Sequence, residues 1–523
     1  MFFSLSQRVA KLVAQCDAAL LKNTLHGIEK ESLRIDKSGL LSQKPHPKAL
    51  GSAFTHDEIT TDFSESLLEF ITPPTTSLEA AADELLRIHQ FTIRNLDDEW
   101  LWPCSMPCVL SQEEEIPLAN YGQTNLGRMK TLYRKGIGMR YGRAMQAIAG
   151  VHYNFSFDDT LLKQVAQNLH DITSTDPVSD LYFGLMRNYH RSSWLVPYLF
   201  GASPVVCGSF FAHEAERFPI PDRSHYANPY AVALRLSDIG YKNRTNDKLH
   251  ISYDSPSAYV ASLKKALLTD DPVFASLGVK QGEEWLQLNS HILQIEAEHY
   301  GSIRPKRIPR PLERPLHALA ERGVQYVEIR TLDLYPFSPI GVDNRVFRFL
   351  DVLMLACLIT ESPSIGPEEQ KILDENLRKV VNEGRKPGLM LTHQNQEWPL
   401  AELGLMFIQN LRQCATLLDK VFNRNCFTES VDMAEERFKQ TEKLPSSQLL
   451  EKVKAAGGSF FKAGLHLAEA HSELLKRMPF SPEAEQKMVH QAEESLRRHE
   501  ALSQMPEPPF DEFMAYYFNP ERL

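Results

Sequence analysis

The stretch "GIEKESLRID", residues 27–36, is strand-like and carries two glutamates two positions apart. Successive residues of a strand point to opposite faces of a sheet, so Glu29 and Glu31 share one face and Lys30 lies on the other. Two carboxylates on one face either cover a solvent-exposed surface or bind a cation. The rest of the chain decides between these two interpretations.

Four further segments show the alternation of short strands, namely residues 66–73, 150–157, 290–298 and 324–334. Helical patterns separate them, and Thr76 and Glu79 predict a capping box at the start of one such helix. Strands and helices interspersed in this way predict an α+β fold whose sheet collects strands from distant parts of the chain.

The C-terminal third has a different character. The apolar run at residues 349–360 predicts a buried helix, since a bilayer span needs roughly 20 apolar residues. We therefore expect one domain over residues 1–523, with a sheet-forming catalytic core at about 20–345 and a largely helical remainder at about 346–523.

Composition narrows the functional class. The 523 residues are 43% hydrophobic and 24% charged, which is ordinary for a globular protein. The formal net charge of −10 argues against a nucleic-acid-binding protein, whose surface would be basic. Seven scattered cysteines do not form a disulfide framework, so we expect a reducing, cytoplasmic compartment. The apolar run at residues 349–360 is too short to span a bilayer, so we expect no membrane attachment.

Polar residues recur on one face of the other predicted strands. The alternation assigns to such faces Glu69, His152, Asn154, Glu328 and Arg330. Asp62 lies just upstream of Glu69 in the chain. A sheet with one solvated face would give the same alternation and is the common antiparallel arrangement. However, this face carries short carboxylates and a histidine rather than the lysines and threonines of a solvated face.

Carboxylates gathered in this way cannot all stay ionised at close range without cations. Oxygen ligands suit hard divalent metals, and Mg²⁺ is usually shared with substrate phosphates. We therefore predict a metal site formed by Glu29, Glu31, Asp62, Glu69, His152 and Glu328, which would bind Mg²⁺ or Mn²⁺.

Phosphate chemistry needs a way to bind a nucleotide, yet the chain has neither a P-loop nor a dinucleotide-binding glycine motif. The basic segment "SIRPKRIPRP", residues 302–311, offers Arg304 and Lys306 on a loop stiffened by prolines. We predict that these two residues contact the nucleotide. A solvated basic loop is the alternative interpretation.

Several long segments resemble one known family. They are "GIEKESLRID", "GSAFTHDEITTDFSESLLEFITP", "NYGQTNLGRMKTLYRKGIGMRYG", "GVHYNFSF", "VPYLFGASPVVC", "YGSIRPKR" and "GVQYVEIRTLDLYPFSPIGV". They resemble the proteobacterial branch of glutamate–cysteine ligase, also called γ-glutamylcysteine synthetase, and run in the same order over roughly residues 20–395. This family belongs to the glutamine synthetase-like carboxylate–amine ligases.

The resemblance implies a curved, mainly antiparallel sheet of about six strands whose concave face forms the active site. It implies the ADP-forming ligation of L-glutamate to L-cysteine through γ-glutamyl phosphate, the first step of glutathione synthesis. ATP is then a co-substrate, and no obligate protein partner is expected. Some relatives carry a fused second ligase for the glycine step, and we expect only the first step here.

The resemblance also implies roles for single residues. Arg330 matches the arginine that reaches the transferred phosphate. The residues that match substrate-binding positions are Arg235, Gln146, Phe63, Tyr133, Tyr241 and Tyr300. For each aromatic residue taken alone, packing in the core is the simpler explanation. Lys30 and Ser32 differ from the arginine and threonine common in the family, but neither lies on the inferred acidic face.

The sequence does not identify the base that deprotonates the cysteine amine. Solvent, the departing phosphate and Asp62 are candidates, and we prefer Asp62 because it is the least enclosed of the carboxylates. Three other functions also remain open at this point. The first is a ligase of the same fold with another amine substrate, the second is a two-metal phosphohydrolase or nuclease, and the third is a protein that only binds metal.

Overall fold

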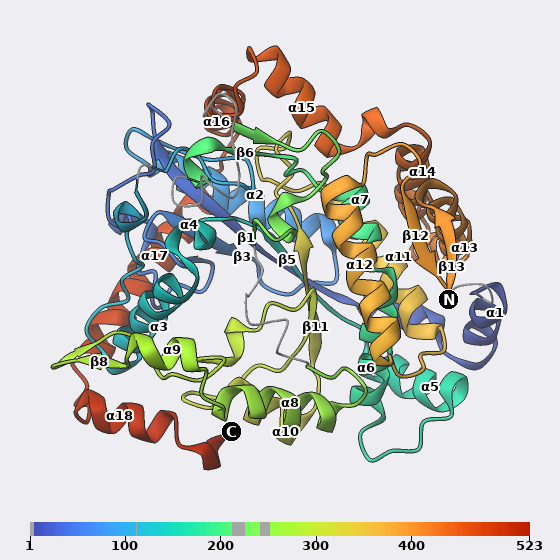
Figure 1. Ribbon diagram of the computed structural model, residues 1–523, viewed down its shortest axis with the longest axis horizontal. Coiled ribbons are helices and arrows are strands. Elements are labelled where there is room, and N and C mark those ends of the chain that lie inside the picture. Colours follow the sequence, from blue (N-terminus) through green and yellow to red (C-terminus); the bar gives the residue numbers. More distant parts are fainter. Residues whose placement is uncertain (1–4, 111, 212–224, 241–250) are drawn as a thin grey trace.

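The computed structural model describes residues 5–110, 112–211, 225–240 and 251–523. At its centre lies an antiparallel sheet (Figure 1) with the strand order β10-β11-β5-β1-β3-β2, in which β4 also pairs with β1. Its strands are β1 (Leu25–Asp36), β2 (Ile59–Thr61), β3 (Leu67–Ile71), β4 (Glu99–Leu101), β5 (Val151–Ser156), β10 (Ile303–Lys306) and β11 (Tyr326–Leu332). The predicted α+β class with a mainly antiparallel sheet is confirmed.

Helices cover one face of this sheet. Tyr153 of β5 donates a hydrogen bond of 2.7 Å to Asp351 of α11 (Asn344–Ile359) and stacks on Phe347 of the same helix. Phe70 of β3 contacts His89 of α2 (Leu78–Arg94), with ring centroids 4.6 Å apart. The apolar side chains of alternate strand positions thus pack on helices, which leaves the polar positions for the other face.

Lys30 lies on the helix-covered face, as the alternation predicts. Its ammonium group is buried, 3.0 Å from His89 Nε2 and in contact with the Ser32 hydroxyl. Burial lowers the pKa of Lys30 to about 7. The departures from the family at Lys30 and Ser32 therefore lie behind the acidic face and not on it.

The remaining helices surround the sheet. Before α11 they are α1 (Leu5–Gln15), α3 (Asn125–Tyr141), α4 (Arg143–Gln146), α5 (Asp159–His170), α6 (Pro177–Ser192), α7 (Leu195–Phe200), α8 (Pro256–Leu268), α9 (Pro272–Leu277) and α10 (Pro315–Arg322). After it come α12 (Pro367–Glu383), α13 (Leu400–Phe422), α14 (Cys426–Lys439), α15 (Pro445–Ala455), α16 (Phe460–Arg477), α17 (Pro482–Ser503) and α18 (Phe510–Tyr517).

Short two-stranded sheets lie outside the central sheet. They pair β6 (Val205–Cys207) with β7 (His225–Ala227), β8 (Lys280–Gln281) with β9 (Glu284–Trp285), and β12 (Met390–His393) with β13 (Gln396–Pro399). In Figure 1 the orange helices α12, α13 and α14 lie to the right of the central sheet, and α17 and α18 lie to its left. Among the described helices, none is both long enough and apolar enough to cross a membrane.

The prediction of a strand at residues 290–298 is wrong. This segment is irregular and ends in a 3₁₀ turn, Glu296–Glu298. Side chains accept from two of its backbone amides: the Gln294 amide donates to Glu298 Oε2 at 2.7 Å, and the His291 amide donates to Asn289 Oδ1 at 3.1 Å. Such local bonds replace those of a sheet.

Two smaller predictions also need correction. Helix α2 is capped by Ser77 rather than Thr76, because Ser77 Oγ accepts from the Ala80 amide at 3.2 Å. The basic segment expected as a loop contributes the strand β10, which lies at the edge of the sheet. An edge strand tolerates Pro305, whose missing N–H costs no ladder hydrogen bond on the open side.

Candidate active site

The first group of acidic residues joins three strands. Glu29 of β1 faces His152 of β5 in the strand register, and Glu328 of β11 faces Asn154 of β5. Glu29 accepts hydrogen bonds from His152 Nδ1 at 3.1 Å and from Asn154 Nδ2 at 2.7 Å. Glu29, His152 and Glu328 each offer a ligand atom, and these three atoms lie within 4.8 Å of one another. We call them the Glu29 cluster.

Cations surround Glu328. Its carboxylate lies 3.2 Å from Lys306 Nζ, 3.2 Å from Arg330 Nη1 and 3.9 Å from Arg304 Nη1. Burial alone would raise the pKa of Glu328, but Lys306 and Arg330 outweigh it and hold the pKa well below its usual range. Glu328 is therefore ionised, and both residues predicted to contact the nucleotide are within ion-pairing distance of it.

The second group lies at the β1–β3 pair. Glu31 and Glu69 face each other directly in the register, and Asp62 follows β2. Burial and the nearby Asp62 raise the pKa of Glu31 to about 8. Burial, followed by the charges of Glu29 and Asp62, raises the pKa of Glu69 well above its usual range. We call Glu31, Glu69 and Asp62 the Glu31 cluster.

The donor set fits a hard divalent cation. Burial, followed by repulsion between the carboxylates, raises the pKa values of Glu31 and Glu69, and a divalent cation would offset both effects. Burial and then Arg330 lower the pKa of His152, so its imidazole is neutral, as metal binding requires. Carboxylate oxygens with one imidazole nitrogen suit Mg²⁺ or Mn²⁺.

A cavity of about 360 Å³ borders both groups, and its lining includes Glu31, His152, Arg235, Tyr300 and Arg330. Arg235 is only 4% exposed and donates from Nη2 to the Arg330 carbonyl at 3.1 Å. A Cβ atom at Gly150 would lie 2.0 Å from that Nη2, so only glycine leaves room for the guanidinium. The register of β11 against β5 shifts between Ile329 and Leu332, a bulge that includes Arg330.

The remaining predicted substrate-binding residues are Gln146 and four aromatic residues. The Tyr300 hydroxyl donates to Gln146 Oε1 at 3.3 Å, and Gln146 is 1% exposed. Burial, followed by the nearby Tyr300 and Glu298, raises the pKa of Tyr133 well above its usual range. The Phe63 ring is buried and faces Gly138 of α3. Tyr241 falls outside the described residues.

The model of the glutamate–cysteine ligase family matches residues 9–380. The chain belongs to the glutamate–cysteine ligase family. It is 41% identical over 516 residues to the glutamate–cysteine ligase of Azotobacter vinelandii, covering 98% of this chain and 97% of that protein. It is 42% identical over 525 residues to that of Alcanivorax borkumensis, covering 98% and 99%.

Solved structures of related ligases agree with this assignment. A crystal structure of glutamate–cysteine ligase from Francisella tularensis in complex with AMP matches with a TM-score of 0.89 and 33% identity, covering 95% of this chain and 98% of that one. A bifunctional glutathione synthetase from Pasteurella multocida matches with a TM-score of 0.70 and 25% identity, covering 89% of this chain and 55% of that one.

Sequence reasoning missed some residues of this ligase site. Arg134 lies 3.9 Å from the Asp62 carboxylate. The only sign of this in the sequence is that Arg134 directly follows Tyr133, a predicted site residue. His190 and His299 line the cavity, and no sequence pattern distinguishes them. Asn154 was placed on the acidic face by alternation, but only the structure shows its bond to Glu29.

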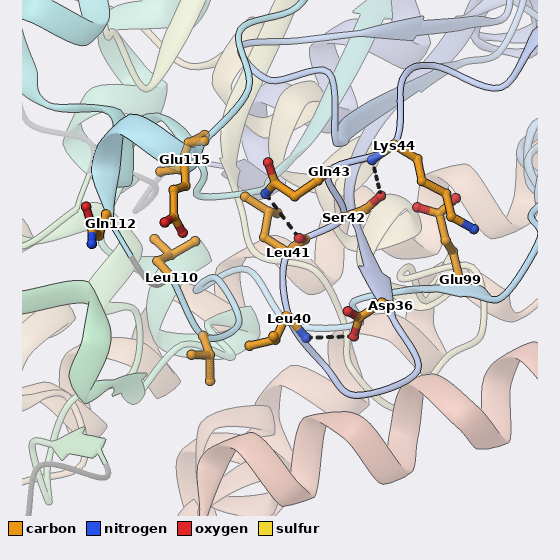
Figure 2. A pocket seen from close by; sticks show the side chains of 12 residues that line it. Asp36, Leu40, Leu41, Ser42, Gln43, Lys44, Glu99, Leu110, Gln112 and Glu115 are labelled. Carbon is orange, nitrogen blue, oxygen red and sulfur yellow. Dashed lines mark hydrogen bonds between the residues drawn. The ribbon is translucent and has the colours of Figure 1, made fainter.

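A second depression of about 330 Å³ lies near the far end of β1 (Figure 2), bordered by Asp36, Leu40 and Lys44. Seven residues along a strand separate Asp36 from Glu29 by about 23 Å. Figure 2 shows that its polar groups bond locally, including the Leu40 amide to Asp36 at 3.1 Å and the Lys44 amide to Ser42 at 3.1 Å. We do not assign ligase chemistry to this depression.

Proposed function

We propose that this protein joins the γ-carboxylate of L-glutamate to the amine of L-cysteine and releases ADP and phosphate, the first step of glutathione synthesis. The observation that supports this most directly is that one cavity touches an acidic face, Arg330 and Arg235 at once. Groups for phosphoryl transfer and for binding a small anionic substrate are thus adjacent. The AMP complex of the Francisella relative supports the use of an adenine nucleotide.

The first step activates the carboxylate. A γ-carboxylate oxygen of glutamate attacks the γ-phosphorus of ATP, the bond to the ADP oxygen breaks, and γ-glutamyl phosphate forms. Arg330 contributes a planar, permanently charged donor to the phosphoryl oxygens that gain charge. Arg235 binds a carboxylate of the substrate glutamate, and its burial makes such an ion pair strong.

The Glu29 cluster and the Glu31 cluster would hold the divalent cations, which neutralise the phosphates when bound. Arg304 and Lys306 then contact the nucleotide phosphates from the β10 side, next to Glu328. This arrangement lets two anionic substrates approach each other without the repulsion they would meet in water.

In the second step the cysteine amine attacks the acyl carbon. The new C–N bond forms, the C–O bond to phosphate breaks, and the amine loses a proton. We assign that proton to Asp62, whose side chain is 35% exposed. Phe63, Tyr133 and Tyr300 shape the pocket for the thiol side chain.

A coupled assay separates this function from its rivals. Purified protein with ATP, Mg²⁺ and glutamate should release ADP at a steady rate only after cysteine is added, and γ-glutamylcysteine should appear in equal amount by mass spectrometry. Phosphate release without glutamate would indicate a phosphohydrolase. ADP release that needs an amine other than cysteine would indicate a different ligase of this fold.

A substitution tests the role of the acidic face. Glu69→Gln should lower kcat at least about a hundredfold, the order of loss in disturbed metal sites. Glu79→Gln is the matched control, because Glu79 pairs with Arg348 and Arg424 away from the cavity. Unchanged turnover in Glu69→Gln would mean that the carboxylates serve stability alone.

A further inference from the structure

Helix α18 packs on the helix that carries Tyr133. Its apolar residues recur at positions i, i+3, i+4 and i+7, and together with α3 and the segment near β9 they form a separate small core. The buried members of this core are Met129, Leu132, Leu288, Phe510, Phe513 and Met514, and Tyr133 packs against them. Figure 1 shows α18, in red, at the lower left beside the β8 strand, and it contacts α3.

Helix α3 has a second set of neighbours on the substrate side. Tyr133 also packs against the main core. Further along the same helix, a Cβ atom added at Gly138 would lie 3.3 Å from Phe63 Cζ, so α3 runs directly beside the Phe63 ring. One helix therefore contacts both the α18 core and a residue of the proposed cysteine pocket.

The sequence of α3 makes this support necessary. The helix contains Gly127, Gly136 and Gly138, and glycine weakens a helix relative to alanine. Neither Gly127 nor Gly136 is replaceable by alanine without a clash, because an added Cβ would lie 2.3 Å from the Tyr121 carbonyl oxygen and 2.2 Å from Gln294 Oε1. A helix of low intrinsic stability takes its position from the elements packed against it.

Polar contacts attach α18 and the segment before it to α3 and to the β8–β9 pair. At the start of α3 the Asn125 amide donates to Glu507 at 2.7 Å, and Asn125 Nδ2 donates to the Pro508 carbonyl at 2.8 Å. Asp511 accepts from Lys280 Nζ at 2.7 Å and from Trp285 Nε1 at 3.0 Å. By contrast, residues 501–509, which lead into α18, are exposed throughout. The helix is thus attached through one apolar face and a few specific bonds.

We propose that α18 is a positioning element for the amine substrate: its Phe513 and Met514 hold α3 so that Tyr133 closes the cysteine pocket. This inference rests on the proposed role of Tyr133 in binding cysteine. Helix α18 would then contribute to selectivity for the amine substrate, while the groups that carry out phosphoryl transfer lie on the sheet.

The test compares full-length variants by their Michaelis constants. Phe513→Ala should raise KM for cysteine about tenfold or more, because small displacements of positioning groups have effects of this size. KM for glutamate and for ATP should stay within about twofold, since Arg235, Arg304 and Lys306 lie outside α3 and α18. Phe513→Leu should restore most of the affinity for cysteine, and Tyr516→Ala, whose ring is 52% exposed on the same helix, should behave like the wild type.

The outcomes separate the two proposals. If Phe513→Ala is folded by circular dichroism but leaves KM for cysteine unchanged, or shifts all three KM values together, the positioning role is overturned. Tyr133→Ala serves as the reference, and its KM for cysteine should rise at least as much. If Tyr133→Ala leaves that KM unchanged, the assignment of the pocket itself is wrong. If Tyr133→Ala raises KM for cysteine but Phe513→Ala does not, the assignment of the pocket is supported and the positioning role of α18 is refuted.

Discussion

Neutralising Glu31 should stabilise the metal-free protein while destroying its activity. The Glu31 carboxyl is 5% exposed and faces Glu69 across the strand pair, and burial with Asp62 raises its pKa to about 8. Keeping a proton at pH 7 on a carboxyl whose ordinary pKa is near 4.5 costs about 3 kcal/mol of folding free energy. Glu31→Gln removes this cost, and its amide oxygen still accepts from the Gly150 amide, which now lies 2.6 Å from Glu31.

The sign of the pH dependence follows from the raised pKa. Between about pH 4.5 and pH 8 the folded protein retains a proton that the unfolded chain has lost, so the metal-free wild type loses stability as pH rises through this window. The thermal midpoint of Glu31→Gln in EDTA should therefore exceed that of the wild type at pH 7.5, and the two should approach each other near pH 5.

Added Mg²⁺ should reverse the order. The wild type gains stability from a bound cation, whereas Glu31→Gln has lost a ligand and should gain less. Glu79→Gln is the control. Hydrogen bonds and Arg348 outweigh the effect of burial and lower the pKa of Glu79 to about 2. This substitution should therefore destabilise the protein slightly and leave its response to Mg²⁺ unchanged. A Glu31→Gln protein that is less stable than the wild type in EDTA, with an equal response to Mg²⁺, would refute the reasoning.

Three further predictions concern other parts of the molecule. Arg330→Lys should lower kcat at least about a hundredfold, because lysine cannot present two donors in a plane, and KM for cysteine should change little in steady-state assays. 2-Aminobutyrate should replace cysteine with a kcat/KM about 10–200-fold lower, since a pocket for one small side chain discriminates weakly, and a complete lack of product at high concentration would contradict the pocket. Burial and then Arg34 lower the pKa of His46 to about 3, so the wild type should lose stability as pH falls below about 6.5, and His46→Phe should reduce this loss by about 1 kcal/mol per pH unit between pH 6 and 4 in denaturant titrations.

The acidic face was predictable because it depends on a simple period. Glu29, Glu31, His152 and Glu328 alternate with side chains that pack on helices, and this pattern is visible in the sequence. Strand order was not predictable in the same way. Alternation shows which face of the sheet a side chain lies on, but not which strand lies next to it. Only the structure therefore shows that Glu31 pairs with Glu69.

Other features could not be predicted from the sequence, and each has a physical reason. The segment 290–298 alternates like a strand, but its amides bond to nearby side chains. Arg304 and Lys306 were expected on a loop because prolines flank them, whereas an edge strand accepts Pro305 and brings both cations to Glu328. Contacts of α18 with α3 join segments almost 400 residues apart, which no local pattern reports.

The most direct test of the central claim is the anomalous scattering of Mn²⁺ in crystals soaked with a non-hydrolysable ATP analogue. We predict peaks between the side chains of Glu29, His152 and Glu328 and beside Glu31 and Glu69, each about 2.0–2.3 Å from carboxylate oxygens. Peaks that appear only on the outer surface, or an acidic face without any peak while the nucleotide is bound, would contradict it.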